Sequence, residues 1–142
     1  MLFPKYRYFF QSLIFGAAVS FSGTAYADVL TCKFTELKHS GGYIPSEITL
    51  EYDEAAKTVS FLAPTDLVDR DGDAVKPILS LTQKGRITFT MTVKTLSQSN
   101  QKGNMKYRLT WIKKNNRATV QAIPLGYSNQ FRAGGRCENS AS

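Results

Sequence analysis

The sequence has little of what enzymes and metalloproteins use for chemistry. Its 142 residues include one histidine, His39, and two cysteines, Cys32 and Cys137. No serine or cysteine stands in the strand–turn–helix setting of an activated nucleophile, and this ligand set has no zinc-site spacing. The carboxylates available to a hydrolase, of which no spacing selects a pair, are Glu47, Glu51, Asp66 and Asp69. We therefore expect a non-enzymatic protein without a cofactor.

Long apolar runs are also scarce. The longest one follows Lys5 and Arg7, ends at Phe21 and precedes Ala25-Tyr26-Ala27, which is the order of a secretory signal peptide. An uncleaved anchor is the alternative, but Gln11 and Ser12 interrupt the run, and a spanning helix needs about 20 apolar residues. The sequence predicts cleavage after Ala27, so that residues 1–27 are removed and residues 28–142 form a single domain without a transmembrane span.

The two cysteines lie near the two ends of the predicted mature chain. Export places both in an oxidising compartment, where we expect a Cys32–Cys137 disulfide. Both fall on the apolar face of a predicted strand, Cys32 with Leu30 and Phe34, and Cys137 with Phe131. Two buried free thiols are the alternative.

Apolar residues alternate with polar ones through most of the chain, and no amphipathic helix is predicted. The clearest case is Arg86–Leu96, which together with Met105–Lys113 predicts a long hairpin around a polar loop, Ser97–Asn104. The other predicted strands are Val29–Leu37, Glu47–Asp53, Thr58–Ala63, Ile78–Thr82, Arg117–Ile123 and Asn129–Cys137. Gly134 and Gly135 predict a bulge or a close backbone approach in the last strand.

About eight short strands with a disulfide between the first and the last predict an all-β fold, a small up-and-down barrel. A two-sheet sandwich is the alternative, because strand counting does not separate the two. Tyr107 and Trp111 fall on the core face of their strand. Tyr43 and Tyr127, which follow glycines in loops, are candidates for exposed recognition aromatics, and the alternative is that they close one end of the barrel.

Carboxylates are absent from residues 74–137. Residues 28–73 hold 10 acidic and 4 basic residues, whereas residues 74–142 hold 12 basic residues and 1 acidic residue. A basic half of this kind predicts a surface for anions, and the candidate side chains are Lys94, Lys106, Arg108, Lys113, Lys114 and Arg117. The alternative is that acidic strands lie beside basic ones and cancel their charge, with the excess serving solubility.

The segment Asp69-Arg70-Asp71-Gly72-Asp73 places three carboxylates at alternate positions, as an EF-hand loop does. Ala74 then stands where that loop needs glycine, and Ser80 stands where it needs a bidentate glutamate. Asp69, Asp71 and Asp73 are therefore a weak calcium-site lookalike, and we expect no metal site here.

The stretch Gly126–Cys137, taken with Cys32-Lys33-Phe34-Thr35-Glu36, resembles a group of small, exported, uncharacterised bacterial β-rich proteins with one cysteine near each end. That resemblance implies no activity. The layout is also similar to the membrane-bound inhibitors of c-type lysozyme. Their inhibitory Ser-Gly and Lys segments are not matched, because Ser40-Gly41-Gly42-Tyr43 has a different spacing.

These patterns favour a monomeric periplasmic or secreted binding protein whose basic half meets an anionic envelope component or an acidic partner. No dedicated nucleic-acid motif is present. The alternative is a protein–protein inhibitor or an envelope assembly accessory that acts through loops such as 41–45 and 64–77.

Overall fold

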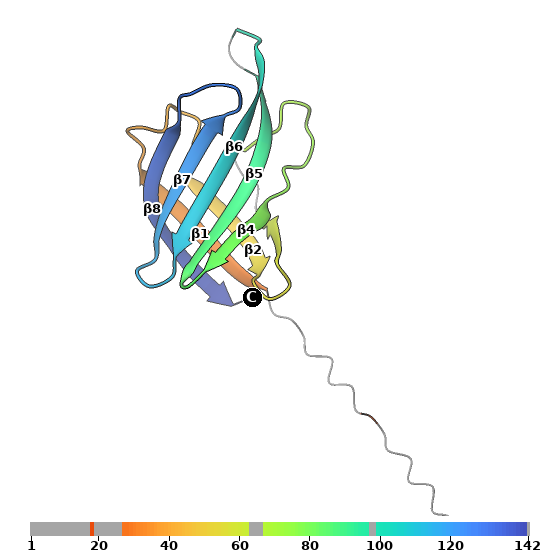
Figure 1. Cartoon of the computed structure of the whole chain (residues 1–142), viewed down its shortest axis with the longest axis vertical. Coiled ribbons are helices and arrows are strands. Elements are labelled where there is room, and N and C mark those ends of the chain that lie inside the picture. Colours follow the sequence, from red (N-terminus) through yellow and green to blue (C-terminus); the bar gives the residue numbers. More distant parts are fainter. Residues whose placement is uncertain (1–17, 19–26, 63–66, 97–98, 142) are drawn as a thin grey trace, which may run out of the picture.

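The protein is an all-β barrel of eight antiparallel strands (Figure 1). The computed structural model describes residues 18, 27–62, 67–96 and 99–141. The predicted signal peptide therefore lies almost entirely outside the described residues, and the first strand begins at Asp28, directly after the predicted cleavage site. No helix in the described part of the chain has the length and hydrophobicity of a membrane span.

The strands follow one another around the barrel as an up-and-down meander. They are β1 Asp28–Glu36, β2 Glu47–Asp53, β3 Thr58–Phe61, β4 Ile78–Gln83, β5 Arg86–Leu96, β6 Lys102–Ile112, β7 Arg117–Pro124 and β8 Phe131–Ala141. The sheet order is β3-β2-β1-β8-β7-β6-β5-β4, so the first and last strands pair in its middle. No ladder among the described residues joins β3 to β4, and the barrel is nearly closed there. The predicted up-and-down barrel is confirmed.

Two strand ends differ from the prediction by more than two residues, and the other boundaries agree within one or two residues. β6 begins at Lys102 rather than Met105, because Lys102, Gly103 and Asn104 continue the ladder with the end of β5. β8 spans 131–141 rather than 129–137, because pairing with β1 carries it on until Ala141 lies opposite Asp28. In both cases a partner strand extends a segment whose own side chains have no clear alternation.

The barrel interior is filled by the apolar residues of each alternating strand. The side chains of Ile87, Phe89, Leu109 and Val120 are fully buried, and Tyr52 packs edge-on against Phe89, with ring centroids 5.6 Å apart. Tyr107 and Trp111 also lie in this core, as predicted. Burial contributes roughly 1.5–3 kcal/mol per large apolar side chain, so the alternation determines which face of every strand points inward.

The predicted disulfide joins Cys32 and Cys137, which lie directly opposite one another on β1 and β8. Both residues are buried in the core, and the structure contains no free cysteine. The β1–β8 ladder shifts register between Phe34 and Glu36, opposite Gly135 and Gly134. A Cβ atom at residue 135 would overlap the backbone carbonyl of Lys33. The predicted close backbone approach is confirmed.

The two ends of the barrel are built differently. The turn end carries the connections 54–57, 84–85 and 113–116, in which Lys57, Gly85 and Asn116 have positive φ. The loop end carries the four longer connections, which span residues 37–46, 62–77, 97–101 and 125–130. Alternating strand direction fixes this arrangement, since every second connection returns to the same end.

Candidate functional site

Strand pairing brings cations from distant parts of the sequence into one row on the outside of the barrel. Arg117 on β7 lies opposite Arg136 on β8, and Arg136 lies opposite Lys33 on β1. Opposed residues on antiparallel strands have Cβ atoms about 4.5–5.5 Å apart. Three cations therefore stand side by side across three strands. The row ends at Glu47 on β2, which lies opposite Lys33.

Further cations lie around this row. Arg86 on β5 is separated from Arg117 by Ile112, and a second row runs from Arg108 through Gln121 to Arg132. Lys106 lies two residues before Arg108 on the outer side of β6. We define the basic face as these seven cations: Lys33, Arg86, Lys106, Arg108, Arg117, Arg132 and Arg136. Within the described residues, none of the seven forms an ion pair with a carboxylate.

Threonines lie between the two basic rows. Thr88, Thr110 and Thr119 are cross-strand neighbours, and the hydroxyls of Thr88 and Thr110 lie 3.2 Å apart. Their small side chains leave two shallow depressions of about 300 and 390 Å³, and both depressions are lined by Arg86 and Arg108. Hydroxyls flanked by two guanidinium groups suit phosphate or carboxylate oxygens.

Some of the predicted binding residues fall outside this face. Lys106, Arg108 and Arg117 belong to it, whereas Lys114 lies in the exposed β6–β7 turn. Lys113 forms an ion pair with Glu54 of the β2–β3 turn, and Lys94 forms ion pairs with Asp71 and Asp73. Neighbouring carboxylates thus neutralise the charges of Lys113 and Lys94. For these two lysines the alternative interpretation holds, in which acidic and basic segments lie side by side and cancel.

Four members of the basic face were not among the predicted binding residues: Lys33, Arg86, Arg132 and Arg136. Arg132 and Arg136 flank two glycines in a strand with weak alternation, and Lys33 lies in the acidic half of the sequence. Only the pairing of β8 with β1 and β7 places Lys33, Arg132 and Arg136 in the same rows as Arg117 and Arg108. Which residues of different strands are neighbours depends on the strand register, and the sequence alone does not give that register.

The acidic loop, residues 69–73, is held against β5 by hydrogen bonds. The carboxylate of Asp69 accepts from the backbone amides of Asp71 and Lys94, at 2.9 and 3.0 Å. These bonds hold the pKa of Asp69 below its usual value. The pKa of Asp71 is also lowered, first by its hydrogen bond from Arg70 and then by that from Lys94. These contacts fix the position of the loop.

The three carboxylates of the calcium-site lookalike do come together, with one oxygen from each of Asp69, Asp71 and Asp73 within 4.8 Å of the others. The Lys94 ammonium lies 3.2 Å from Asp71 and 2.9 Å from Asp73. The hydrogen bonds that the Lys94 ammonium donates to Asp73 and Asp71 raise the pKa of Lys94. Lysine therefore supplies the positive charge, and we interpret the motif as the anchor of the loop.

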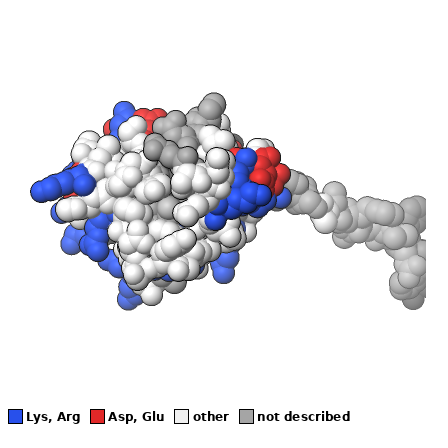
Figure 2. Space-filling view, turned by 90° about the horizontal axis from the view of Figure 1, so that it is seen from above, with Lys and Arg blue, Asp and Glu red and all other residues white. Residues whose placement is uncertain are grey.

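Seen from the loop end, charge is confined to the rim of the barrel (Figure 2). Lys and Arg appear without acidic neighbours along the lower left of this view, whereas basic and acidic atoms touch at the right. The centre of the view is uncharged. The loop end and the basic face are therefore two distinct surfaces.

No catalytic arrangement stands out on the basic face, whose functional groups are cations, hydroxyls and one amide. The resemblances to small exported bacterial proteins and to lysozyme inhibitors stay predictions from the sequence. Comparison of the chain with family models, with curated proteins and with solved structures found no match.

Proposed function

We propose that the protein is a non-enzymatic periplasmic or secreted binding protein whose basic face binds an anionic component of the cell envelope. The observation that carries this proposal is the seven cations on five strands, which pair with no carboxylate of the described residues. Phosphate-rich glycolipids, anionic phospholipids, teichoic acids and acidic proteins all have the required charge.

Folding alone gives no reason for this arrangement. Like charges directly opposite on neighbouring strands are destabilising, by a few tenths up to about 1 kcal/mol per pair. Arg117 and Arg136 form one such pair, and Arg136 and Lys33 form another. A polyanion laid across the rows would relieve this repulsion, so that binding should also stabilise the fold.

The proposal is tested by the salt dependence of binding. Heparin and vesicles with anionic lipid serve as probes, and affinity is measured from low salt to about 0.15 M, where the Debye length is about 8 Å. We expect affinity to fall by about tenfold or more, because exposed charges are screened over this range. We also expect heparin to raise the melting temperature of the protein at low salt.

A matched pair of variants separates the basic face from net charge. Arg108→Glu/Arg117→Glu/Arg132→Glu reverses three cations of the face. Lys38→Glu/Lys57→Glu/Lys84→Glu makes the same change in net charge at three exposed lysines outside it. Only the first variant should lose binding, and both should melt cooperatively. Equal losses in the two would show that net charge alone attracts the probe.

The alternative function, a protein inhibitor or assembly accessory acting through the loops, gives a different result. It expects capture of one envelope protein with little dependence on salt, which the first variant would not disturb. Parental affinity for both anionic probes in the first variant would overturn the basic-face proposal and leave this alternative.

A further inference from the structure

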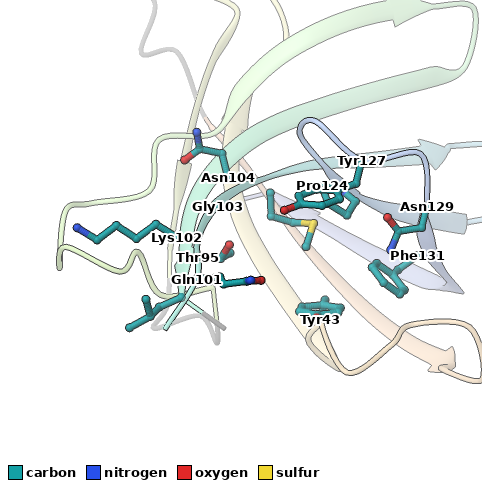
Figure 3. Close-up of a pocket in the computed structure, with 12 residues that line it drawn as sticks. Tyr43, Thr95, Gln101, Lys102, Gly103, Asn104, Pro124, Tyr127, Asn129 and Phe131 are labelled. Atoms are coloured by element: carbon teal, nitrogen blue, oxygen red, sulfur yellow. The ribbon is translucent and has the colours of Figure 1, made fainter. Parts of the chain in front are cut away.

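A pocket opens at the loop end, between the tip of the β5–β6 hairpin and the β7–β8 loop (Figure 3). Its volume is about 210 Å³. Tyr127, Pro124, Asn129 and Phe131 lie on one side, Thr95 and Gly103 lie on the other, and Tyr43 closes a third side. The pocket thus draws on the β1–β2 loop, the β5–β6 hairpin and the β7–β8 connection.

Two aromatic residues of the pocket, Tyr43 and Phe131, are held in place by neighbouring residues. The Tyr107 hydroxyl donates a 2.7 Å hydrogen bond to the backbone carbonyl of Tyr43, and burial raises the pKa of Tyr107 to about 12, so that it keeps this proton. The rings of Tyr43 and Phe131 lie 4.8 Å apart, and Gly41 leaves room for the Phe131 ring. Tyr43 is nevertheless 47% exposed and Tyr127 is 69% exposed. The Tyr43 ring is therefore positioned but uncovered, and the Tyr127 ring is more exposed still.

The polar groups of the pocket are neutral with one exception. Amides come from Gln101, Asn104 and Asn129, and a hydroxyl comes from Thr95. Among the described residues that line the pocket, Lys102 supplies the single charge and none is a carboxylate. The side-chain amides of Asn104 and Asn129 belong to exposed residues and make no hydrogen bond within the described structure. They can turn both donors and acceptors toward a ligand.

From this combination we propose that the pocket binds one pyranose ring of a glycan. Aromatic faces pack against the C–H face of a sugar ring, and amides and hydroxyls exchange hydrogen bonds with its hydroxyl groups. The volume lies below the roughly 300 Å³ at which pockets for larger organic ligands begin, which fits a single ring. The pocket is open to solvent, so the rest of the glycan would extend outward past Lys102.

Other ligands fit the pocket less well. An alkyl chain offers no partner to the amides of Asn104 and Asn129, whereas the hydroxyl groups of a sugar both donate and accept hydrogen bonds. A polyanion would meet only Lys102 here, whereas the basic face offers seven cations. Sugar binding in the pocket is thus independent of the anion binding proposed above.

The test is titration of the ¹⁵N-labelled protein with three trisaccharides, followed by amide chemical shifts. The probes are N-acetylchitotriose, maltotriose and trigalacturonate, which are N-acetylated, neutral and acidic. We expect at least one of them to shift the amides around Tyr43, Asn104 and Tyr127 in a saturable way, with little effect of salt for the two uncharged probes.

Substitutions then assign the contact. Tyr127→Ala should weaken binding by about tenfold, the lower end of what an aromatic stacking partner contributes, and Tyr127→Phe should retain it. Tyr127 is exposed, and its side chain makes no hydrogen bond or aromatic ring contact among the described residues, so neither change should alter the melting temperature. The Arg108→Glu/Arg117→Glu/Arg132→Glu variant should bind the uncharged sugar like the parent, which separates this pocket from the basic face.

Three outcomes would overturn the proposal. The first is the absence of saturable shifts in the pocket with all three probes. The second is parental affinity in the Tyr127→Ala variant. The third is a response of the same amides to vesicles of zwitterionic phosphatidylcholine but not to the sugars, which would make this end a membrane contact instead.

Discussion

The turn end and the loop end of the barrel are made from the same eight strands, yet their surfaces differ. All eight exposed large apolar residues among the described ones lie in the connections of the loop end or at the strand ends beside them: Leu37, Tyr43, Leu62, Val68, Ile78, Leu96, Leu125 and Tyr127. The three turns of the other end carry lysines, a glutamate and small residues. Exposed apolar groups are thus collected at one end.

The difference shows which end is under structural constraint and which end is available for binding. Turns of two or four residues leave the chain few conformations, so residues such as Gly85 and Asn116 adopt positive φ. The longer loops can carry side chains that folding does not require, including the aromatic walls of the pocket. Loops placed on a rigid scaffold commonly carry function.

Removing the disulfide between β1 and β8, two strands that run between both ends of the barrel, should have the largest effect. In the variant Cys32→Ala/Cys137→Ala, the loss of a link that spans 105 residues should cost about 2–5 kcal/mol of unfolding free energy. Denaturant unfolding measures it. Reducing agent should lower the stability of the parent and leave the variant unchanged, and an equal response in both would contradict a structural role for the disulfide.

Gly135→Ala should come next, with a cost of about 1–3 kcal/mol or more, because the new methyl group would overlap the backbone of Lys33. Gly134→Ala is the matched control. There the new methyl group meets only the carboxylate end of Glu36, which can rotate away. Similar melting temperatures for the two variants would show that the β1–β8 ladder yields more easily than its geometry indicates.

Gly85→Ala and Gly42→Ala compare the two ends directly. Both glycines have positive φ, 67° and 76°, and neither would place a new Cβ atom near another residue. Strain of about 1–2 kcal/mol is expected for Gly85→Ala, whose two-residue turn cannot relax. Gly42 lies in a ten-residue loop that can adjust, so its variant should lose less. Equal losses in thermal unfolding would mean that the loop end is as constrained as the turn end.

The smallest effect concerns the acidic loop. The folded-state pKa of Asp69 lies below its ordinary value of 3.8, so its contribution to stability is present above that value and is lost as the pH falls through the folded pKa. Asp69→Asn should therefore melt slightly below the parent near neutral pH. The difference in melting temperature between the variant and the parent should disappear in acid. A difference that persists at roughly pH 2 would show that the carboxylate charge does not contribute to stability.

Much of the fold could be predicted from the sequence, because the alternation of apolar and polar residues within a strand identifies the face that is buried. Alternation in Arg86–Leu96 identified β5 and its inward side chains, and the prediction of export, taken with the two cysteines, identified the bond between β1 and β8. The ends of β6 and β8 were missed, since they depend on a partner strand rather than on local pattern.

The candidate sites could be predicted only in part, for the same reason. Lys94 looked like a free cation on the wet face of a strand, but a loop more than 20 residues away in the sequence brings Asp71 and Asp73 to it. Arg136 and Lys33 carried no signal until β1 and β8 were paired. Tyr43 and Tyr127 were identified as exposed aromatics, but the pocket that they share with Phe131 needs the loops in three dimensions.

The sheet order has a consequence for the connectivity of the chain. Read from β4 through β8 and on from β1 to β3, the strands form one simple meander, whose only missing connection is between β8 and β1. Asp28 and Ala141 lie opposite one another at that junction, where a hairpin turn would be, and the disulfide links the same two strands four residue pairs further along. A circular permutation that joined Asp28 to Ala141 and opened the chain within 62–77 would place the new ends at the unpaired edges. In the order given by the sequence, the first and last strands instead lie in the middle of the sheet.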